Sequence, residues 1–275
     1  MTADQIAALC TEPGKARQIQ LVQTEFREQI CDAWGLPEGS RLLEVGCGQG
    51  DMTAVLADRV GPDGHVTAVD RADPSYGAPL TLQQATDRLK QTVLGERINF
   101  RFQFDLLDND FEDDSFEVVL LAHCSWYFAD RAQLTDTLRE AARLAPRLAF
   151  SEWDLSITHL EQASHLLAAL IQGGVEAFRP DGAGNIRSPF SLHEFREIIA
   201  AAGWKETSLT GLDTTRLQDA RWEIDMALSE ARPPPNMPKK LIDFLAVQRG
   251  VLERLSHQVS PAPLPSYAML AERNR

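Results

Sequence analysis

The sequence predicts an α/β fold in which helices cover both faces of a mostly parallel, doubly wound sheet of seven strands. Three observations lead to this prediction. Short apolar runs alternate with segments of helical length between residues 41 and 153. A glycine-rich corner joins the first apolar run to the first of these helical segments. The chain has 275 residues, which suffices for one large domain or for one domain with a substantial cap.

The elements can be justified in chain order. Helices are expected over residues 4–34, where one apolar face recurs at steps of three and four through Ile19, Val22, Phe26, Ile30 and Trp34. A turn at "LPEGS" ends this region. The alternating region then predicts strands at 41–45, 65–70, 98–105, 116–123 and 147–153, and helices at 51–60, 81–94 and 131–145.

The C-terminal part adds longer helical segments to this pattern. Residues 156–200 read as largely helical, with an interruption at "RPDGAGNIRSP". Late strands are expected at 203–213 and 266–274, with a helical segment at about 216–258 between them.

The composition narrows the class of protein. The net charge is −13 and the sequence pI is near 4.9, which argues against a nucleic-acid partner because such proteins usually carry a basic face. No apolar run approaches the roughly 20 residues of a membrane span, and the N-terminus lacks the pattern of a signal peptide. The four cysteines stand singly, so neither a zinc site nor a disulfide framework is indicated. We therefore expect a cytoplasmic protein with reduced thiols, no metal and no membrane partner.

The glycine-rich corner "EVGCGQGD" predicts a ligand site at the end of the first strand. Glycines let the backbone turn sharply, and the helix that follows offers free N–H groups. The spacing is Gly46-x-Gly48-x-Gly50, and Asp51 occupies the place of the last glycine in a dinucleotide motif. Glu44 would repel a pyrophosphate, so we expect a ligand that carries positive charge.

Two further acids stand at the ends of the next strands. Asp70 lies 20 residues beyond Gly50, where a carboxylate can accept hydrogen bonds from both hydroxyls of a ribose. Asp105 ends the third strand and suits an exocyclic amine, although an acid there is often only a cap. Together these acids predict a nucleoside that bears an amino acid and positive charge.

Three segments resemble known motifs. "LLEVGCGQG", "VTAVD" and "FEVVLLAHCSWYF" are similar to the first, second and fourth motifs of the class I S-adenosylmethionine-dependent methyltransferases. The resemblance is strong over residues 37–155 and weak over the final strands. The segments "DRADPSYGAPLTLQQA" and "GNIRSPFS" resemble a small-molecule group of microbial specialised metabolism, the methyltransferase type 11-like group.

The resemblance implies a Rossmann-like fold, S-adenosylmethionine as cofactor, and a set of contacts. Around the methionine part it implies Glu44, Gly46, Cys47, Gly48 and Gly50; at the ribose Asp70 and Arg71; at the adenine Asp105 and Leu106; and near the sulfonium His123. The loop after Asp70 is longer than is usual in the family, which leaves the ribose contacts beyond Asp70 open. The implied division is an N-terminal helical lid at 1–36, the cofactor-binding core at 37–155, a helical substrate cap at 156–200, and the C-terminal strands with a helical insertion at 201–275.

Methyl transfer needs little chemistry from the protein beyond positioning and desolvation. The catalytic candidates are His123 and Asp154, with a core histidine and a helix cap as the alternatives. The acceptor candidates follow the fourth and fifth strands or lie in the later insertion: Trp126, Tyr127, Trp153, Asn185 and Arg187. For the three aromatic residues, a place in the core is the alternative. His159 and His165 are expected at the surface, and Cys47 is expected to be there because it is small.

The motifs exclude several subclasses of methyltransferase. "AHCSWYF" lacks both the Asp/Asn-Pro-Pro-aromatic motif of amino-methylating nucleic-acid enzymes and the Pro-Cys nucleophile of RNA cytosine-5 enzymes, and no metal-binding carboxylate set is found. A metal-free enzyme that methylates a small molecule at O, N or C is the expected function. The alternative is a cyclase or regulatory protein that binds the same cofactor without methyl transfer. The acceptor stays open, and the N-terminal helices could instead pack behind the sheet or join two subunits of a homo-oligomer.

Overall fold

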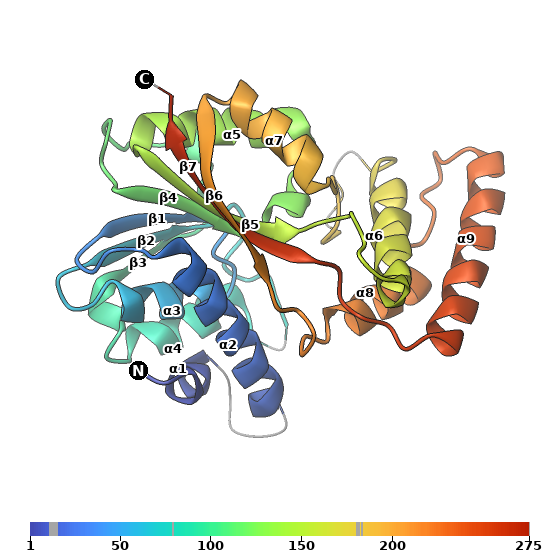
Figure 1. Ribbon diagram of the computed structural model, residues 1–275, viewed down its shortest axis with the longest axis horizontal. Coiled ribbons are helices and arrows are strands. Elements are labelled where there is room, and N and C mark those ends of the chain that lie inside the picture. Colours follow the sequence, from blue (N-terminus) through green and yellow to red (C-terminus); the bar gives the residue numbers. More distant parts are fainter. Residues whose placement is uncertain (11–15, 79, 180–181, 183, 275) are drawn as a thin grey trace.

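The computed structural model describes residues 1–10, 16–78, 80–179, 182 and 184–274 (Figure 1). Within them seven strands form one sheet in the order β3-β2-β1-β4-β5-β7-β6. The strands are β1 (Arg41–Val45), β2 (His65–Val69), β3 (Ile98–Arg101), β4 (Val118–Ala122), β5 (Arg147–Trp153), β6 (Trp204–Leu212) and β7 (Ser266–Arg273). The first five are parallel, whereas β7 runs antiparallel to both β5 and β6. The predicted class, a mostly parallel sheet of seven strands, is confirmed.

The central strands form because their residues are apolar on both faces. Leu42, Leu43 and the whole of Val118–Leu121 are fully buried, as expected for parallel strands with helices on each side. Strand order reverses between β1 and β4, which are neighbours in the sheet. The connections that leave their carboxyl ends diverge there, and this is where open α/β sheets bind ligands.

Helices cover the two faces of the sheet (Figure 1). One layer comprises α1 (Ala3–Cys10), α2 (Ala16–Trp34), α3 (Asp51–Arg59) and α4 (Leu82–Lys90); the other comprises α5 (Arg131–Leu144) and α7 (Leu192–Ala201). Of the apolar face predicted for residues 4–34, Val22, Phe26, Ile30 and Trp34 are buried against the first layer and the sheet, whereas Ile19 is 38% exposed. The last member of this face, Trp34, is 1% exposed and donates its indole N–H to the Phe150 carbonyl oxygen at 3.3 Å. In the described part of the chain, short 3₁₀ helices span Gly95–Arg97, Leu106–Asp108, Ser125–Tyr127 and Leu160–Gln162.

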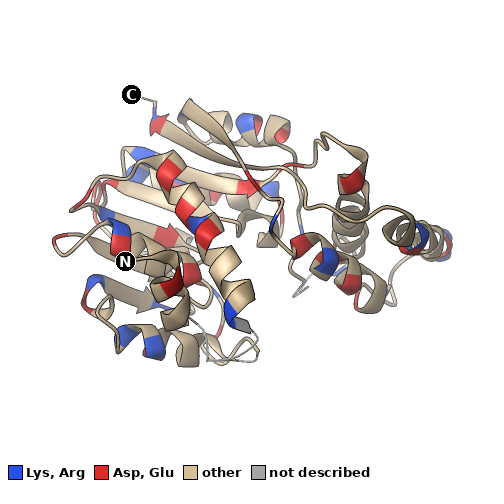
Figure 2. Ribbon diagram, turned by 60° about the horizontal axis from the view of Figure 1, so that its bottom comes forward, with Lys and Arg blue, Asp and Glu red and all other residues tan. Residues whose placement is uncertain are grey.

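The remaining helices, α6 (Ala163–Glu176), α8 (Asp219–Ser229) and α9 (Lys239–Gln258), form a separate lobe beyond the end of β5 (Figure 1). They share their own core, whose buried members include Ile171, Ile224 and Leu252. None of the helices in the described ranges is both long and apolar enough to span a lipid bilayer. Acidic and basic residues are mixed along the helices (Figure 2).

Some predicted boundaries were wrong. The segment expected to be helical over 216–258 is two helices, because four prolines lie between α8 and α9 and cannot continue a helix. The strand expected to reach residue 105 ends at Arg101, since Gln103 turns the chain with a φ of 52°. The helix expected over 81–94 ends at Lys90.

Candidate functional site

The glycine corner after β1 has a backbone that favours glycine. Gly46, Gly48 and Gly50 all have left-handed φ values, of 80°, 52° and 87°. A Cβ on Gly46 would lie 2.7 Å from Cβ of Cys124, so the turn after β4 packs directly on this corner. At Gly48, in contrast, no heavy atom among the described residues would lie within 4 Å of an added Cβ. The corner therefore has one closed side and one open side.

Asp70 joins this corner to the end of β2. Its Oδ2 accepts the Gly48 N–H at 2.8 Å, and its Oδ1 accepts the Ala72 N–H at 2.8 Å. The N–H groups of Gly46 and Cys47 both donate to the Val69 carbonyl oxygen. A carboxylate oxygen can accept more than one hydrogen bond, so Asp70 keeps capacity for a ligand on both oxygens.

Glu44 differs from the open carboxylate that the sequence suggested. It is 2% exposed, and its Oε2 accepts the hydroxyl of Thr53 on α3 at 2.6 Å. Burial raises its pKa to about 8, because desolvation penalises the charged form. The carboxyl is therefore mostly protonated at neutral pH, and it ties β1 to α3. Arg27 of α2 opposes this shift, as a cation at the corner would.

The third predicted acid pairs with a predicted neighbour. Asp105 caps the 3₁₀ helix that follows it by accepting the Leu107 N–H at 3.0 Å. Its other oxygen lies 3.2 Å from the Arg71 guanidinium. Leu106 is 3% exposed beneath them. The structure thus brings the expected ribose and adenine residues together.

His123 ends β4 in a left-handed conformation, with a φ of 50°, which is rare for a residue with a Cβ. Its Nε2 lies 3.2 Å from the hydroxyl oxygen of Ser151 and 3.1 Å from that of Ser266, while its Nδ1 lies 3.5 Å from Oε1 of Glu152. Burial lowers the pKa of His123 to about 3. The ring is therefore neutral, and its approach to Glu152 is not an ion pair between charged groups.

Glu152 was given no specific role from the sequence, yet it lies at the centre of this edge. It is 1% exposed, and its Oε2 accepts both the N–H and the hydroxyl of Ser125, at 3.0 and 2.6 Å. Its Oε1 accepts the Trp153 N–H at 3.0 Å. Burial raises its pKa to about 7. The signal in the sequence was a lone carboxylate inside the apolar strand "RLAFSEW".

The three aromatic residues expected to line one pocket are separated. Trp126 is 2% exposed and packs edge-on against Phe190, so it takes the core position that was the alternative to lining a pocket. Tyr127 is 50% exposed. Trp153 is half-buried, with its ring centroid 4.8 Å from that of His123. Only the latter two therefore lie where a ligand could reach them.

Asp154 holds another element in place. Its Oδ1 accepts the N–H of Leu192, the first residue of α7, at 3.0 Å, and the N–H of Ser156 at 3.1 Å. Asp154 thus has the capping role that was the alternative to a catalytic role, but it caps α7 and not the next helix in the chain.

The segment that carries Asn185 and Arg187 reaches the turn after β4, because the Arg187 N–H donates to the Trp126 carbonyl oxygen at 2.8 Å.

His165 was expected at the surface, and this was wrong. It is fully buried on α6, and its Nδ1 accepts the Leu264 N–H at 2.9 Å. The proton of the neutral ring must then sit on Nε2. His159, in contrast, is half exposed and lies 3.0 Å from Glu161.

Polar bridges that the sequence did not indicate join α2 to the site and to the helical lobe. Gln20 donates to Asp51, the first residue of α3, at 2.6 Å, and Gln23 donates to Asp219 of α8 at 2.8 Å. Burial raises the pKa of Asp219 and also of Glu223, one turn later on α8. The only hint in the sequence was the pair of glutamines beside the apolar face of α2.

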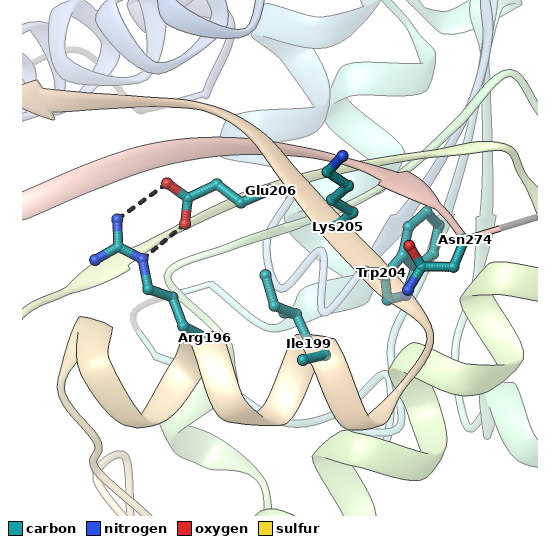
Figure 3. A pocket seen from close by; sticks show the side chains of 7 residues that line it. Arg196, Ile199, Trp204, Lys205, Glu206 and Asn274 are labelled. Carbon is teal, nitrogen blue, oxygen red and sulfur yellow. Dashed lines mark hydrogen bonds and ion pairs between the residues drawn. The ribbon is translucent and has the colours of Figure 1, made fainter.

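A surface hollow of about 360 Å³ lies elsewhere (Figure 3). Arg196 and Ile199 of α7 line it from one side and Trp204, Lys205 and Glu206 of β6 from the other. Trp204 pairs with Arg273 at the start of β6, so the hollow is near the end of the sheet opposite to the glycine corner. Arg196 and Glu206 are ion-paired across it at 2.7 Å, and we assign it no role in the site.

Across the described part of the chain no group of three or more His, Cys, Asp or Glu side chains has a metal-binding arrangement.

Comparisons with known proteins point to one activity. Residues 42–146 match the model of a methyltransferase domain family. Methyltransferase phomM' of Diaporthe leptostromiformis is 29% identical over 263 residues, which covers 79% of this chain and 68% of that protein. Methyltransferase phomM of the same fungus is 28% identical, which covers 61% of this chain and 54% of that protein. This chain thus spans between about half and two thirds of these relatives.

One solved structure is similar along nearly the whole chain. It is the crystal structure of a cyclopropane-fatty-acyl-phospholipid synthase-like protein from Lactobacillus casei, with 36% identity and a TM-score of 0.87. The match covers 98% of each chain. The helical lobe and the N-terminal helices therefore belong to the shared fold together with the sheet.

Proposed function

This chain belongs to the class I S-adenosylmethionine-dependent methyltransferases, and we propose that it methylates a small-molecule acceptor of specialised metabolism at O, N or C. The N-terminal helices (1–36) act as a lid on the cofactor-binding core (37–155), residues 156–200 cap the acceptor, and residues 201–275 complete the sheet with a helical insertion. The cofactor supplies a methyl group that is already activated, so the chain must bind, orient and exclude water.

We assign the cofactor to the open side of the glycine corner. The space beside Gly48 lets a ligand lie against the backbone. Asp70 has acceptor capacity for ribose hydroxyls, and the Arg71–Asp105 pair borders the proposed adenine position. The proposed cofactor would lie on a surface formed by Gly46, Cys47, Gly50 and Leu106. Glu44 lies beneath the proposed methionine part. These features fit a cofactor with an amino acid, a ribose and a positive charge.

One observation carries the proposal of a small acceptor: this chain's own helices enclose the end of β5. The Trp153 ring lies between Phe26 of α2 and His165 of α6, with ring centroids 6.3 and 5.4 Å away. Gln23 further bridges α2 to α8. A folded macromolecule needs an open edge on which to dock, whereas an edge covered by helices favours an acceptor that can be enclosed.

The acceptor side of the site uses Tyr127 and Trp153, with Asn185 and Arg187 approaching from the cap. Neutral His123 has a ring nitrogen that can accept a proton from an acceptor O–H or N–H. Asp154 serves the site by anchoring α7 to the end of β5.

The test is incubation of the protein with methyl-labelled cofactor and separate fractions of metabolites, lipids, RNA and protein. The lipid fraction is included because the similar Lactobacillus casei protein is named as a cyclopropane-fatty-acyl-phospholipid synthase-like protein. We expect the label in a small-molecule fraction together with an equal amount of S-adenosylhomocysteine, and only background label with Asp70→Ala. Label confined to RNA or protein would refute the small-molecule acceptor.

A second function, binding of the same cofactor without methyl transfer, is favoured by one observation. The candidate bases are already engaged inside the protein: His123 by two serines and Asp154 by two backbone N–H groups. A cyclase or a regulatory binding protein would need no base. The same assay separates the two functions, because this one predicts tight cofactor binding and no S-adenosylhomocysteine with any fraction.

A further inference from the structure

Four side chains from three strand ends meet beside the proposed acceptor site. Glu152 is the penultimate residue of β5, Ser125 and His123 belong to the turn after β4, and Ser266 begins β7. Each of these residues forms a hydrogen bond with at least one of the others. The proposed function uses only His123 from this group and leaves a buried carboxyl, Glu152, without a role.

Glu152 determines where the turn after β4 lies. One carboxyl oxygen accepts both donors of Ser125, the residue that opens the 3₁₀ helix carrying Trp126 and Tyr127. The other oxygen accepts a backbone N–H of its own strand. This set of bonds joins the turn to β5. Since Cys124 packs on Gly46, it also sets the distance between the turn and the cofactor corner.

The hydrogen bonds around His123 indicate which nitrogen carries its proton. The Ser266 hydroxyl donates to the Glu152 carbonyl oxygen at 3.1 Å, so towards the His123 Nε2 it offers a lone pair. The Ser151 hydroxyl, 3.2 Å from the same nitrogen, can either accept from it or donate to it. The Ser266 contact favours an Nε2–H, which leaves a lone pair on Nδ1 facing Glu152 Oε1 at 3.5 Å. That contact is attractive when Glu152 is protonated and repulsive when it is ionised. Loss of the Glu152 proton therefore favours moving the ring proton to Nδ1.

We propose that Glu152 is a positioning residue for methyl transfer, which fixes the turn carrying Tyr127 and sets the tautomer of His123. This inference rests on the proposed acceptor site. When Glu152 is protonated, the His123 Nε2 holds the proton; when Glu152 is ionised, Nδ1 holds it and Nε2 becomes the acceptor. The ring stays neutral throughout, and no proton leaves the pair except the one from Glu152.

The other titratable groups around the pair do not reproduce this behaviour. Arg27 faces it from α2 and keeps its charge. Cys124 and Tyr127 face it from the turn, and Tyr267 faces it from β7. The pKa of each of the three is raised, so each stays neutral through the physiological range. Burial also raises the pKa of Glu152, to about 7, which places its ionisation within that range.

The experiment follows the ring nitrogens of ¹⁵N-histidine-labelled protein by NMR from pH 5.5 to 8.5, with His123 assigned from a His123→Gln sample. We expect the His123 signals to change from the Nε2–H to the Nδ1–H pattern around neutral pH without becoming those of a cation. Glu152→Gln, which keeps the size but not the proton, should abolish the change. The control is Glu206→Gln, which changes a carboxylate of β6 that is ion-paired with Arg196 of α7. This variant should still show the change of tautomer.

Kinetics with the acceptor found by the labelling assay complete the test. Glu152→Gln should lower kcat at least tenfold, remove its pH dependence near neutrality, and change the cofactor Kd by less than twofold. A single His123 tautomer over the whole pH range in the wild-type protein would overturn the inference, as would an unchanged step in Glu152→Gln. If that variant does not fold, the wild-type NMR series alone decides. These spectra need no acceptor, so they remain decisive where the labelling assay finds no methyl transfer.

Discussion

Gly48 has a φ of 52° beside open space, and this combination allows its two roles to be separated. Gly48→Ala forces a Cβ into the left-handed region, which costs about 1–2 kcal/mol, and projects it into the proposed cofactor position. We expect that loss of unfolding free energy together with a cofactor Kd at least tenfold higher, by calorimetry. Gly35 is the matched control, with a φ of 55° and no heavy atom of the described residues within 4 Å. Gly35→Ala should lose similar stability and no affinity; equal affinities in both variants would contradict the assignment.

Glu44 gives stability a pH dependence of defined sign. The carboxyl titrates near 4.5 in the unfolded chain and at about 8 in the folded protein. Between these values the folded state binds more protons, so this group's contribution to stability falls as pH rises from about 5 to 8. In Glu44→Gln the decrease in unfolding free energy over this interval should be smaller by at least about 1 kcal/mol. Chemical denaturation at several pH values measures it. Glu117→Gln, at an exposed carboxylate whose pKa is lowered by Arg41, should not flatten the curve.

Sequence reasoning identified the backbone of this site better than its charges. Gly46, Gly48, Gly50 and Asp70 follow from spacing, because a sharp turn at a strand end allows few residue types. The protonation of Glu44 does not follow, since it depends on how deeply α3 buries the carboxyl. Glu152 was not selected because its partner Ser125 lies 27 residues away, and nothing local relates the two.

Helix α2 has two functional halves. Its last turn is fixed to the sheet by Trp34, whereas Gln20, Gln23 and Phe26 contact the site and the helical lobe. If α2 is a lid, hydrogen exchange should slow on cofactor binding over residues 16–27 and stay unchanged over 28–34, where packing already protects the backbone. Mass spectrometry of the exchanged peptides measures this, with α9 as an internal control. Equal protection of both halves would indicate a purely structural helix.

Boundaries of elements were predictable where a local signal exists. Helix α5 follows its predicted range closely because Asp130 caps its start and its apolar residues keep a helical period. The division between α8 and α9 was missed although its prolines are visible, because the apolar period continues on both sides of them. The antiparallel placement of β7 between β5 and β6 depends on pairing over more than 50 residues of chain, which no local pattern specifies.

At the scale of the molecule, the described residues form three hydrophobic cores, one on each face of the sheet and one in the helical lobe. Leu252 of α9 is fully buried in the lobe core, whereas its neighbour Val251 is 40% exposed. Leu252→Ala should destabilise the lobe by about 2–5 kcal/mol and leave cofactor affinity unchanged, because the cofactor corner belongs to a different core. Val251→Ala should change stability by less than about 0.5 kcal/mol. Local exchange in α9 and calorimetry test this, and a loss of affinity in Leu252→Ala would show that the cores are coupled.

The position of β7 has a consequence for folding during synthesis of the protein. Its start supplies Ser266 to His123 and its length covers the open side of β5, yet it is synthesised after all the other strands of the sheet. Domains generally acquire structure from the N-terminus as they are synthesised, so a nascent chain can assemble the cofactor corner while β5 is still a bare edge. The synthesis of β7 is then the event that completes the proposed acceptor side. Before that event, the growing polypeptide can have a folded cofactor corner while its proposed acceptor side is still incomplete.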